Sequence, residues 1–145
     1  MAAKLEQSLR EIATQYDLVA IYAFGSRARE IASRVPGHLA DEMVAEHPDA
    51  DVDIGVLCSP GHDLSARDRV KLMLALEDLF QAPRVDLVIL READPFLAAN
   101  IVRGERLYAQ DSYLADEYDL YVLRRAGDLA PLARERMALI LGEGV

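Results

Sequence analysis

The stretch YAFGSRARE, residues 22–30, joins an apolar run to a glycine-serine pair that is followed by two arginines. It completes the run LVAIYAF, residues 18–24, which is short and rich in β-branched and aromatic side chains and therefore predicts a buried strand. Glycine tolerates a positive φ angle and serine caps a first helical turn, so we expect a helix to start at Ser26. Such a turn is common and does not by itself indicate a ligand. Its meaning depends on the rest of the chain.

Size and composition indicate one globular domain spanning residues 1–145. The chain is 52% hydrophobic and 28% charged, and a chain of 145 residues can bury a core without a disulfide or a structural metal. Its single cysteine, Cys58, excludes an internal disulfide and a CxxC metal site, and we expect it to be a small buried residue at a strand end. No apolar stretch has the length of a membrane span or the form of a leader, so we expect a cytoplasmic protein that does not contact membranes.

The charge balance limits the partners. With 25 Asp and Glu against 16 Lys and Arg, the formal net charge is −9, which repels a nucleic-acid backbone. We therefore expect no direct binding to DNA or RNA. Nucleotides remain compatible with this charge if metal ions lie between carboxylates and phosphates.

Two further apolar segments predict strands, and both carry acids. DVDIGVL, residues 51–57, alternates, with hydrophobic side chains on one face and Asp51 and Asp53 on the other. RVDLVIL, residues 84–90, contains one acid, Asp86. Burying an unpaired carboxylate costs several kcal/mol, so three acids in apolar strands predict either a compensating cation or a site open to water.

Helical segments surround these strands in the sequence. Ser65, with Asp68 three residues later, has the spacing of a capping box for a helix to about Phe80, and Asp94 followed by Pro95 predicts another helix start. We expect helices over about 5–17, from 26, over 65–80 and 94–103, and in a C-terminal helical segment, 112–145, that is interrupted near Gly127 and Pro131. Three core strands with packed helices give an α/β (α+β) fold.

Together, these residues are suited to phosphate chemistry. An Asp-x-Asp pair supplies the hard oxygen ligands that Mg²⁺ prefers, and backbone N–H groups after Gly25, with the Ser26 hydroxyl, would receive phosphate oxygens at a helix start. Asp86 is placed to bind a second metal ion or to accept the proton of an attacking hydroxyl. Arg27 and Arg29 could reach the same phosphates, although a helical arginine is more often a solvated surface group.

Gly25-Ser26, Asp51-Val52-Asp53 and Asp86 in VDLVIL resemble the signature of the DNA polymerase β-type nucleotidyltransferases. The short chain and its tail look like the minimal nucleotidyltransferase (MNT) antitoxins, partners of helical HEPN ribonuclease toxins, and the resemblance spans about residues 18–133. It implies a polymerase β-type core, a small mixed sheet flanked by helices, with a helical C-terminal third.

The resemblance also implies site roles. Gly25, Ser26 and Arg27 would bind the nucleotide, and Asp51, Asp53 and Asp86 would bind Mg²⁺, with two ions expected, and serve catalysis. ATP would donate AMP to a tyrosine of the HEPN toxin, itself expected to be a dimer, and this transfer would silence its RNase activity.

Several alternatives remain open. The antitoxin could neutralise its partner by binding alone. A small-molecule nucleotidyltransferase is disfavoured because the chain has no room for a second substrate domain.

The segment between Ser26 and Asp51 is longer than in the minimal members, so we expect a surface insertion at 34–50 that could also cover the ATP site or contact the partner. Asp49 offers a second Asp-x-Asp pair with Asp51, but the hydrophobic residues after Asp53 favour 51/53. Four C-terminal tyrosines suit either packing or a partner face: Tyr108, Tyr113, Tyr118 and Tyr121.

Overall fold

The computed structural model describes residues 2–35 and 48–142, so most of the predicted insertion at 34–50 lies outside the described residues. Along the chain the elements are α1 (Ala2–Tyr16), β1 (Leu18–Phe24), α2 (Ala28–Ala32), β2 (Val52–Cys58), α3 (Ala66–Phe80), β3 (Val85–Ile89), the 3₁₀ turn η1 (Leu90–Glu92), α4 (Pro95–Val102), β4 (Glu105–Ala109) and α5 (Ser112–Leu141).

The strands form one mixed sheet in the order β3-β2-β1-β4. β1 runs antiparallel to β2 and to β4, whereas β2 and β3 are parallel. The sequence predicted three core strands, and the fourth, β4, was missed. It is a five-residue edge strand in which only Leu107 is buried, so it lacks the apolar run or clear alternation that predicts a strand.

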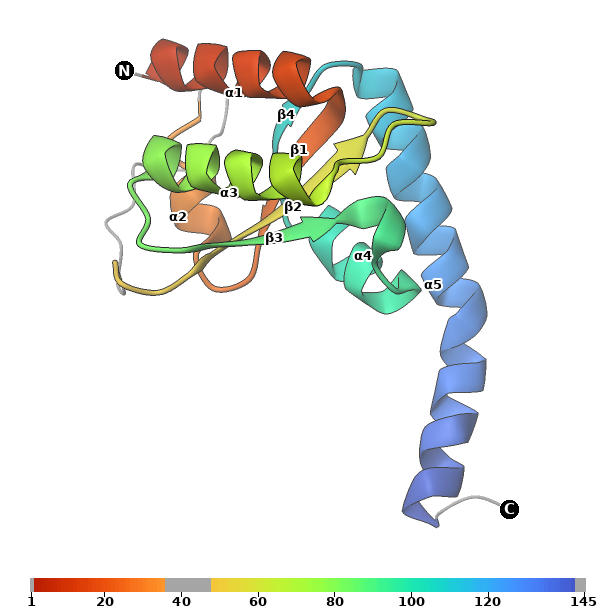
Figure 1. The fold of residues 1–145 in the computed structure, drawn as a ribbon. Coiled ribbons are helices and arrows are strands. Elements are labelled where there is room, and N and C mark those ends of the chain that lie inside the picture. The colour runs from red at the N-terminus through yellow and green to blue at the C-terminus, as the bar shows by residue number, and fades with distance from the viewer. Residues whose placement is uncertain (1, 36–47, 143–145) are drawn as a thin grey trace.

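Helices cover both faces of the sheet (Figure 1). On one face, α1, α2 and α3 pack in a cluster with alternate residues of the central strands, including Ile21 and Ile54. On the other, α4 and the first half of α5 pack in a second cluster with Tyr22 and Leu57. The two clusters follow from the alternation of side chains along each strand.

Polar caps start three of the described helices, and all three starts were predicted, although only the caps Ser65 and Asp94 were named from the sequence. The Ser65 hydroxyl accepts a hydrogen bond from the Asp68 N–H at 3.1 Å. The Asp94 carboxylate accepts from the N–H groups of Phe96 and Leu97, at 2.9 and 3.0 Å. The third cap, Asp111, accepts from Leu114 at 3.1 Å. Each cap satisfies N–H groups that the first helical turn leaves without a partner.

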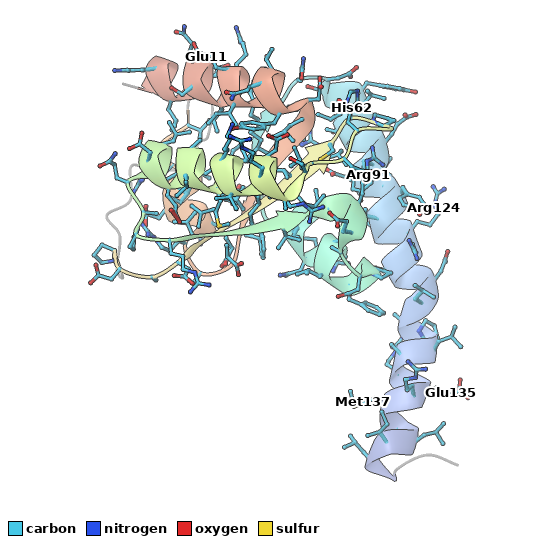
Figure 2. All side chains as sticks on the ribbon, viewed as in Figure 1. Glu11, His62, Arg91, Arg124, Glu135 and Met137 are labelled. Atoms are coloured by element: carbon cyan, nitrogen blue, oxygen red, sulfur yellow. The ribbon has the colours of Figure 1, made fainter. Side chains whose placement is uncertain are left out.

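The long helix α5 continues through Gly127 and Pro131, so the predicted interruption there was wrong. A proline at 131 removes the bond that its N–H would donate to the carbonyl of Gly127, but strong helix formers flank it on both sides. The C-terminal half of α5 extends away from the rest of the molecule, with Glu135 and Met137 on this part (Figures 1 and 2). None of the helices in the described ranges is both long and apolar enough to cross a membrane.

A polar contact fastens the first half of α5 to the sheet. The Tyr22 hydroxyl on β1 donates to the Asp119 carboxylate at 2.5 Å, and Arg106 on β4 donates to the other oxygen of Asp119 at 2.6 Å. Arg106 also binds Asp116 one turn earlier, at 2.8 Å. Because Tyr22 is fully buried, these bonds hold α5 at one position against the sheet.

Candidate active site

The turn after β1 meets the start of β2. Phe24, the last residue of β1, pairs with Asp53 on β2, and Gly25 follows with a φ angle of +75°. A Cβ built on Gly25 would lie 2.1 Å from Oδ2 of Asp53, so only a glycine leaves room for that carboxylate. Ser26, the next residue, is exposed. Strand pairing thus places the predicted phosphate-binding turn directly against a predicted metal ligand.

The parallel pairing of β2 with β3 adds the next acid. Asp53 is the register partner of Asp86, and side chains at paired positions of neighbouring strands lie on the same face of a sheet. The pKa of Asp53 is raised above its usual range, first by burial and then by the negative charges of Asp86 and Asp51. The three acids named from the sequence are therefore brought close enough to interact electrostatically.

Asp51 lies one residue before β2, is exposed, and has one oxygen 3.9 Å from Nε of Arg84. An exposed pair at this distance contributes little free energy, so Asp51 remains available to a cation. Asp49, in the alternative Asp-x-Asp pair, is exposed in the preceding turn, and it is not among the charges that raise the pKa of Asp53. The geometry favours the pair 51/53.

This donor set fits Mg²⁺. Its ligand atoms are carboxylate oxygens, and their mutual repulsion would be relieved by a cation. Within residues 2–35 and 48–142, no three or more His, Cys, Asp or Glu side chains are already arranged to hold a metal ion. A bound Mg²⁺ would then complete its octahedron with water and with phosphate oxygens of a substrate, as this ion usually does.

Arg27, which the sequence predicted to contact the nucleotide, faces into the protein. Its side chain is 6% exposed, and its guanidinium binds Glu30 and two backbone carbonyls of the chain that enters β2. The predicted phosphate contact of Arg27 therefore has no support in this structure. Arg29, by contrast, is exposed on α2. Because α2 has only five residues, its dipole adds little to phosphate binding, which would depend on the Gly25-Ser26 backbone and hydroxyl.

Glu30 was not named from the sequence. It is buried beside Arg27, and the i, i+3 spacing of the two residues on a predicted helix was the available signal. That spacing alone is uninformative because most such pairs are exposed, and only the tertiary structure shows that this one is buried.

The C-terminal tyrosines divide between the two predicted uses. Tyr118 is half-buried, and the guanidinium of Arg91 lies 5.2 Å from its ring centroid (Arg91 is labelled in Figure 2). Tyr108 is packed against the core. Tyr113 and Tyr121 are 70% and 55% exposed, so they are available to a partner.

Comparisons with known proteins identify the fold. Residues 7–113 match the family model described as Polymerase beta, Nucleotidyltransferase. None of the curated proteins matches the chain at a significant level.

Several solved structures have the same fold. A chain of a toxin-antitoxin complex with AMP-PNP is 25% identical, with a TM-score of 0.63, over 93% of this chain and 94% of that one. A chain from the complex of tri-AMPylated Shewanella oneidensis HEPN toxin with MNT antitoxin is 23% identical, with a TM-score of 0.62, over 97% and 96%. A chain of the toxin-antitoxin MntA-HepT is 23% identical, with a TM-score of 0.59, over 95% of each. With the family model matching most of its length, the chain belongs to the polymerase β nucleotidyltransferase family.

Proposed function

We propose that this protein is a minimal nucleotidyltransferase antitoxin that transfers AMP from ATP to a tyrosine of a HEPN RNase toxin and thereby neutralises it. The observation that carries the proposal is the contact of Asp53 with Gly25 on one side and its register with Asp86 on the other. A glycine-serine turn beside a cluster of acids that repel one another serves a triphosphate with its metal ions better than it serves stability.

We assign the roles from the positions of the residues. Gly25 and Ser26 bind the triphosphate, and Asp51, Asp53 and Asp86 hold Mg²⁺, with two ions expected. When bound, the metal would neutralise the negative charge of the phosphates. A bond forms between the tyrosine oxygen and the α-phosphorus of ATP, the bond from that phosphorus to the bridging oxygen breaks, and pyrophosphate leaves. Asp86, exposed at the edge of the cluster, either completes the metal site or accepts the phenol proton.

Two of the related structures contain groups of the kind that this reaction would use or produce. One contains AMP-PNP, an ATP analogue, and another contains a toxin that carries AMP groups. The assignment to the cytoplasm agrees with a reaction that consumes ATP.

A binding-only antitoxin is the second candidate. It is favoured by the C-terminal half of α5, on which Leu132, Met137, Leu139, Ile140 and Leu141 are all at least 55% exposed. Such side chains can bind another protein without any contribution from the acids. Under this alternative the toxin is silenced by complex formation, and the acidic cluster is unused.

The test is intact-mass spectrometry of a HEPN toxin incubated with this protein, ATP and Mg²⁺, with the toxin's RNase activity measured in parallel. We expect the toxin to gain the mass of one or more AMP groups, on tyrosine, and to lose RNase activity. The same reaction with Asp53→Asn should give neither result.

The two candidates predict different outcomes for that variant. If Asp53→Asn silences the toxin as the wild type does and no mass is gained in either reaction, binding alone accounts for the activity and the enzyme proposal fails.

A further inference from the structure

A buried ion pair directly follows the Gly25-Ser26 turn in the chain. The side chains of Arg27 and Glu30 are 6% and 7% exposed, and they are joined by two hydrogen bonds, from Nε at 2.9 Å and from Nη2 at 3.3 Å. Arg34 binds the same Glu30 carboxylate and donates through its other nitrogen to the carbonyl of Phe80 at 2.9 Å. Glu30 is thus paired with two guanidinium groups.

The remaining nitrogen of Arg27 reaches the chain that enters β2. Nη1 donates to the carbonyl of Ala50 at 3.0 Å and to that of Pro48 at 3.3 Å. Ala50 directly precedes Asp51, which directly precedes β2. One side chain therefore joins the residue after the Gly25-Ser26 turn to the residue before the first acid.

Stability alone does not explain a buried ion pair between Arg27 and Glu30. Replacing a buried ion pair with well-packed apolar residues is often neutral or stabilising. A guanidinium has a rigid fork of hydrogen-bond donors, which an apolar side chain lacks. This fork can fix two backbone segments relative to each other. The segments fixed here are those that carry the turn and the acids.

We propose that Arg27, oriented by Glu30, is a positioning residue that sets Asp51 and Asp53 relative to Gly25 and Ser26. The inference rests on the proposed function, because it concerns the metal and nucleotide site of that reaction. In this proposal Arg27 acts by binding Glu30 and the carbonyls of Pro48 and Ala50, and not by contact with the phosphates.

Arg34 provides a matched control. It shares Glu30 with Arg27 but donates to Phe80 at the end of α3 and not to residues 48–50. Arg27→Lys and Arg34→Lys both keep the positive charge and both weaken the bonds to Glu30. Only Arg27→Lys removes the fork that also holds Pro48 and Ala50.

The experiment is titration of the isolated protein with Mn²⁺, a paramagnetic substitute for Mg²⁺, followed by electron paramagnetic resonance without toxin or ATP. A thermal unfolding curve is recorded for each variant to check that it is folded at the titration temperature. We expect Arg27→Lys to weaken Mn²⁺ binding about 10- to 100-fold, as loss of a group that orients metal ligands typically does, and Arg34→Lys to leave it within about twofold of wild type. Should Arg27→Lys not fold, Glu30→Gln is the second variant, since it keeps a neutral acceptor for Arg27 and should give a smaller loss in the same direction.

Wild-type affinity in Arg27→Lys, or in Glu30→Gln where that variant is used, would overturn the inference. So would an equal loss in Arg27→Lys and Arg34→Lys, because it would trace the effect to the shared ion pair. Asp53→Asn separates this from failure of the proposed function: if Asp53→Asn binds Mn²⁺ as the wild type does, the metal site itself is wrong.

Discussion

Gly25 and Asp53 lie so close together that a methyl group on the glycine would be 2.1 Å from Oδ2 of the Asp53 carboxylate. The two residues come from different strands that pair antiparallel, and the contact exists because Phe24 is the register partner of Asp53. A single side chain on the turn would therefore displace a predicted metal ligand.

We predict that Gly25→Ala lowers AMP transfer at least about 100-fold, because a shift of about 1 Å in a reacting group can have an effect of this size. It should also cost about 1–2 kcal/mol of stability, since the φ angle of +75° is unfavourable for alanine. Transfer is measured by mass spectrometry of the toxin, and stability by urea denaturation.

Gly61→Ala is the control for Gly25→Ala. Gly61 has a φ angle of +80°, and a Cβ built on it would meet no atom within 4 Å. It should show the same stability loss with transfer unchanged. Equal loss of transfer in both variants would show that backbone strain, and not displacement of Asp53, is responsible.

Asp53→Asn should abolish detectable transfer and stabilise the metal-free protein at neutral pH, because it removes one of three carboxylates whose charges repel one another. The pKa of Asp53 is raised in the folded state, so the folded protein holds this proton more tightly than the unfolded chain does. The ionised carboxylate therefore disfavours folding once the pH rises above the ordinary aspartate value of 3.8. Urea denaturation in a chelator, from about pH 4 to neutral pH, should show the advantage of the variant growing with pH.

Asp49→Asn tests whether the effect belongs to the cluster. It removes an exposed acid from the alternative Asp-x-Asp pair, and we expect both transfer and the pH dependence of stability to remain as in wild type. Loss of transfer in this variant would favour the pair 49/51.

Tyr22→Phe should destabilise the protein by about 1.5–3 kcal/mol, the range for a hydrogen bond to a charged group. The hydroxyl of Tyr22 donates to Asp119, and both its burial and this carboxylate raise its pKa well above the usual value of 10. The neutral phenol therefore contributes stability that is fully present below about pH 10 and is lost as the pH rises above it. Denaturation curves at neutral and alkaline pH should show this loss in wild type and not in Tyr22→Phe.

Tyr113→Phe is the matched control, since Tyr113 is 70% exposed on the same helix that Tyr22 anchors. Its stability should stay within about 0.5 kcal/mol of wild type. A loss equal to that of Tyr22→Phe would mean that the buried bond to Asp119 is not what holds α5.

Pro131→Ala should strengthen the C-terminal half of α5 without changing the global free energy of unfolding. The substitution restores a helical hydrogen bond in a segment whose side chains are largely exposed, so the gain stays local. Hydrogen exchange should become slower around residues 127–141, while urea denaturation followed by tyrosine fluorescence, to which residues 127–141 contribute no tyrosine, is unchanged. A rise in the global midpoint would show that this half of the helix unfolds together with the sheet.

Most of the local structure could be predicted from the sequence. β1 was predicted at its observed bounds, β2 and β3 to within one residue at each end, and the helix starts at Ser65 and Asp94 are confirmed. These features depend on side-chain alternation and on hydrogen bonds between residues close in sequence, so a short window of sequence contains them. The acids were identified for the same reason, because a charge in an apolar strand is conspicuous.

Features that depend on contacts between distant segments could not be predicted from the sequence. β4 is a strand only because β1 offers it an edge to pair with. Strand register set Asp53 against Gly25 and beside Asp86, and the approach of residues 48–50 to α2 turned Arg27 inward to Glu30. Side-chain burial and strand register arise from contacts between segments far apart in the chain, and local sequence patterns do not encode them.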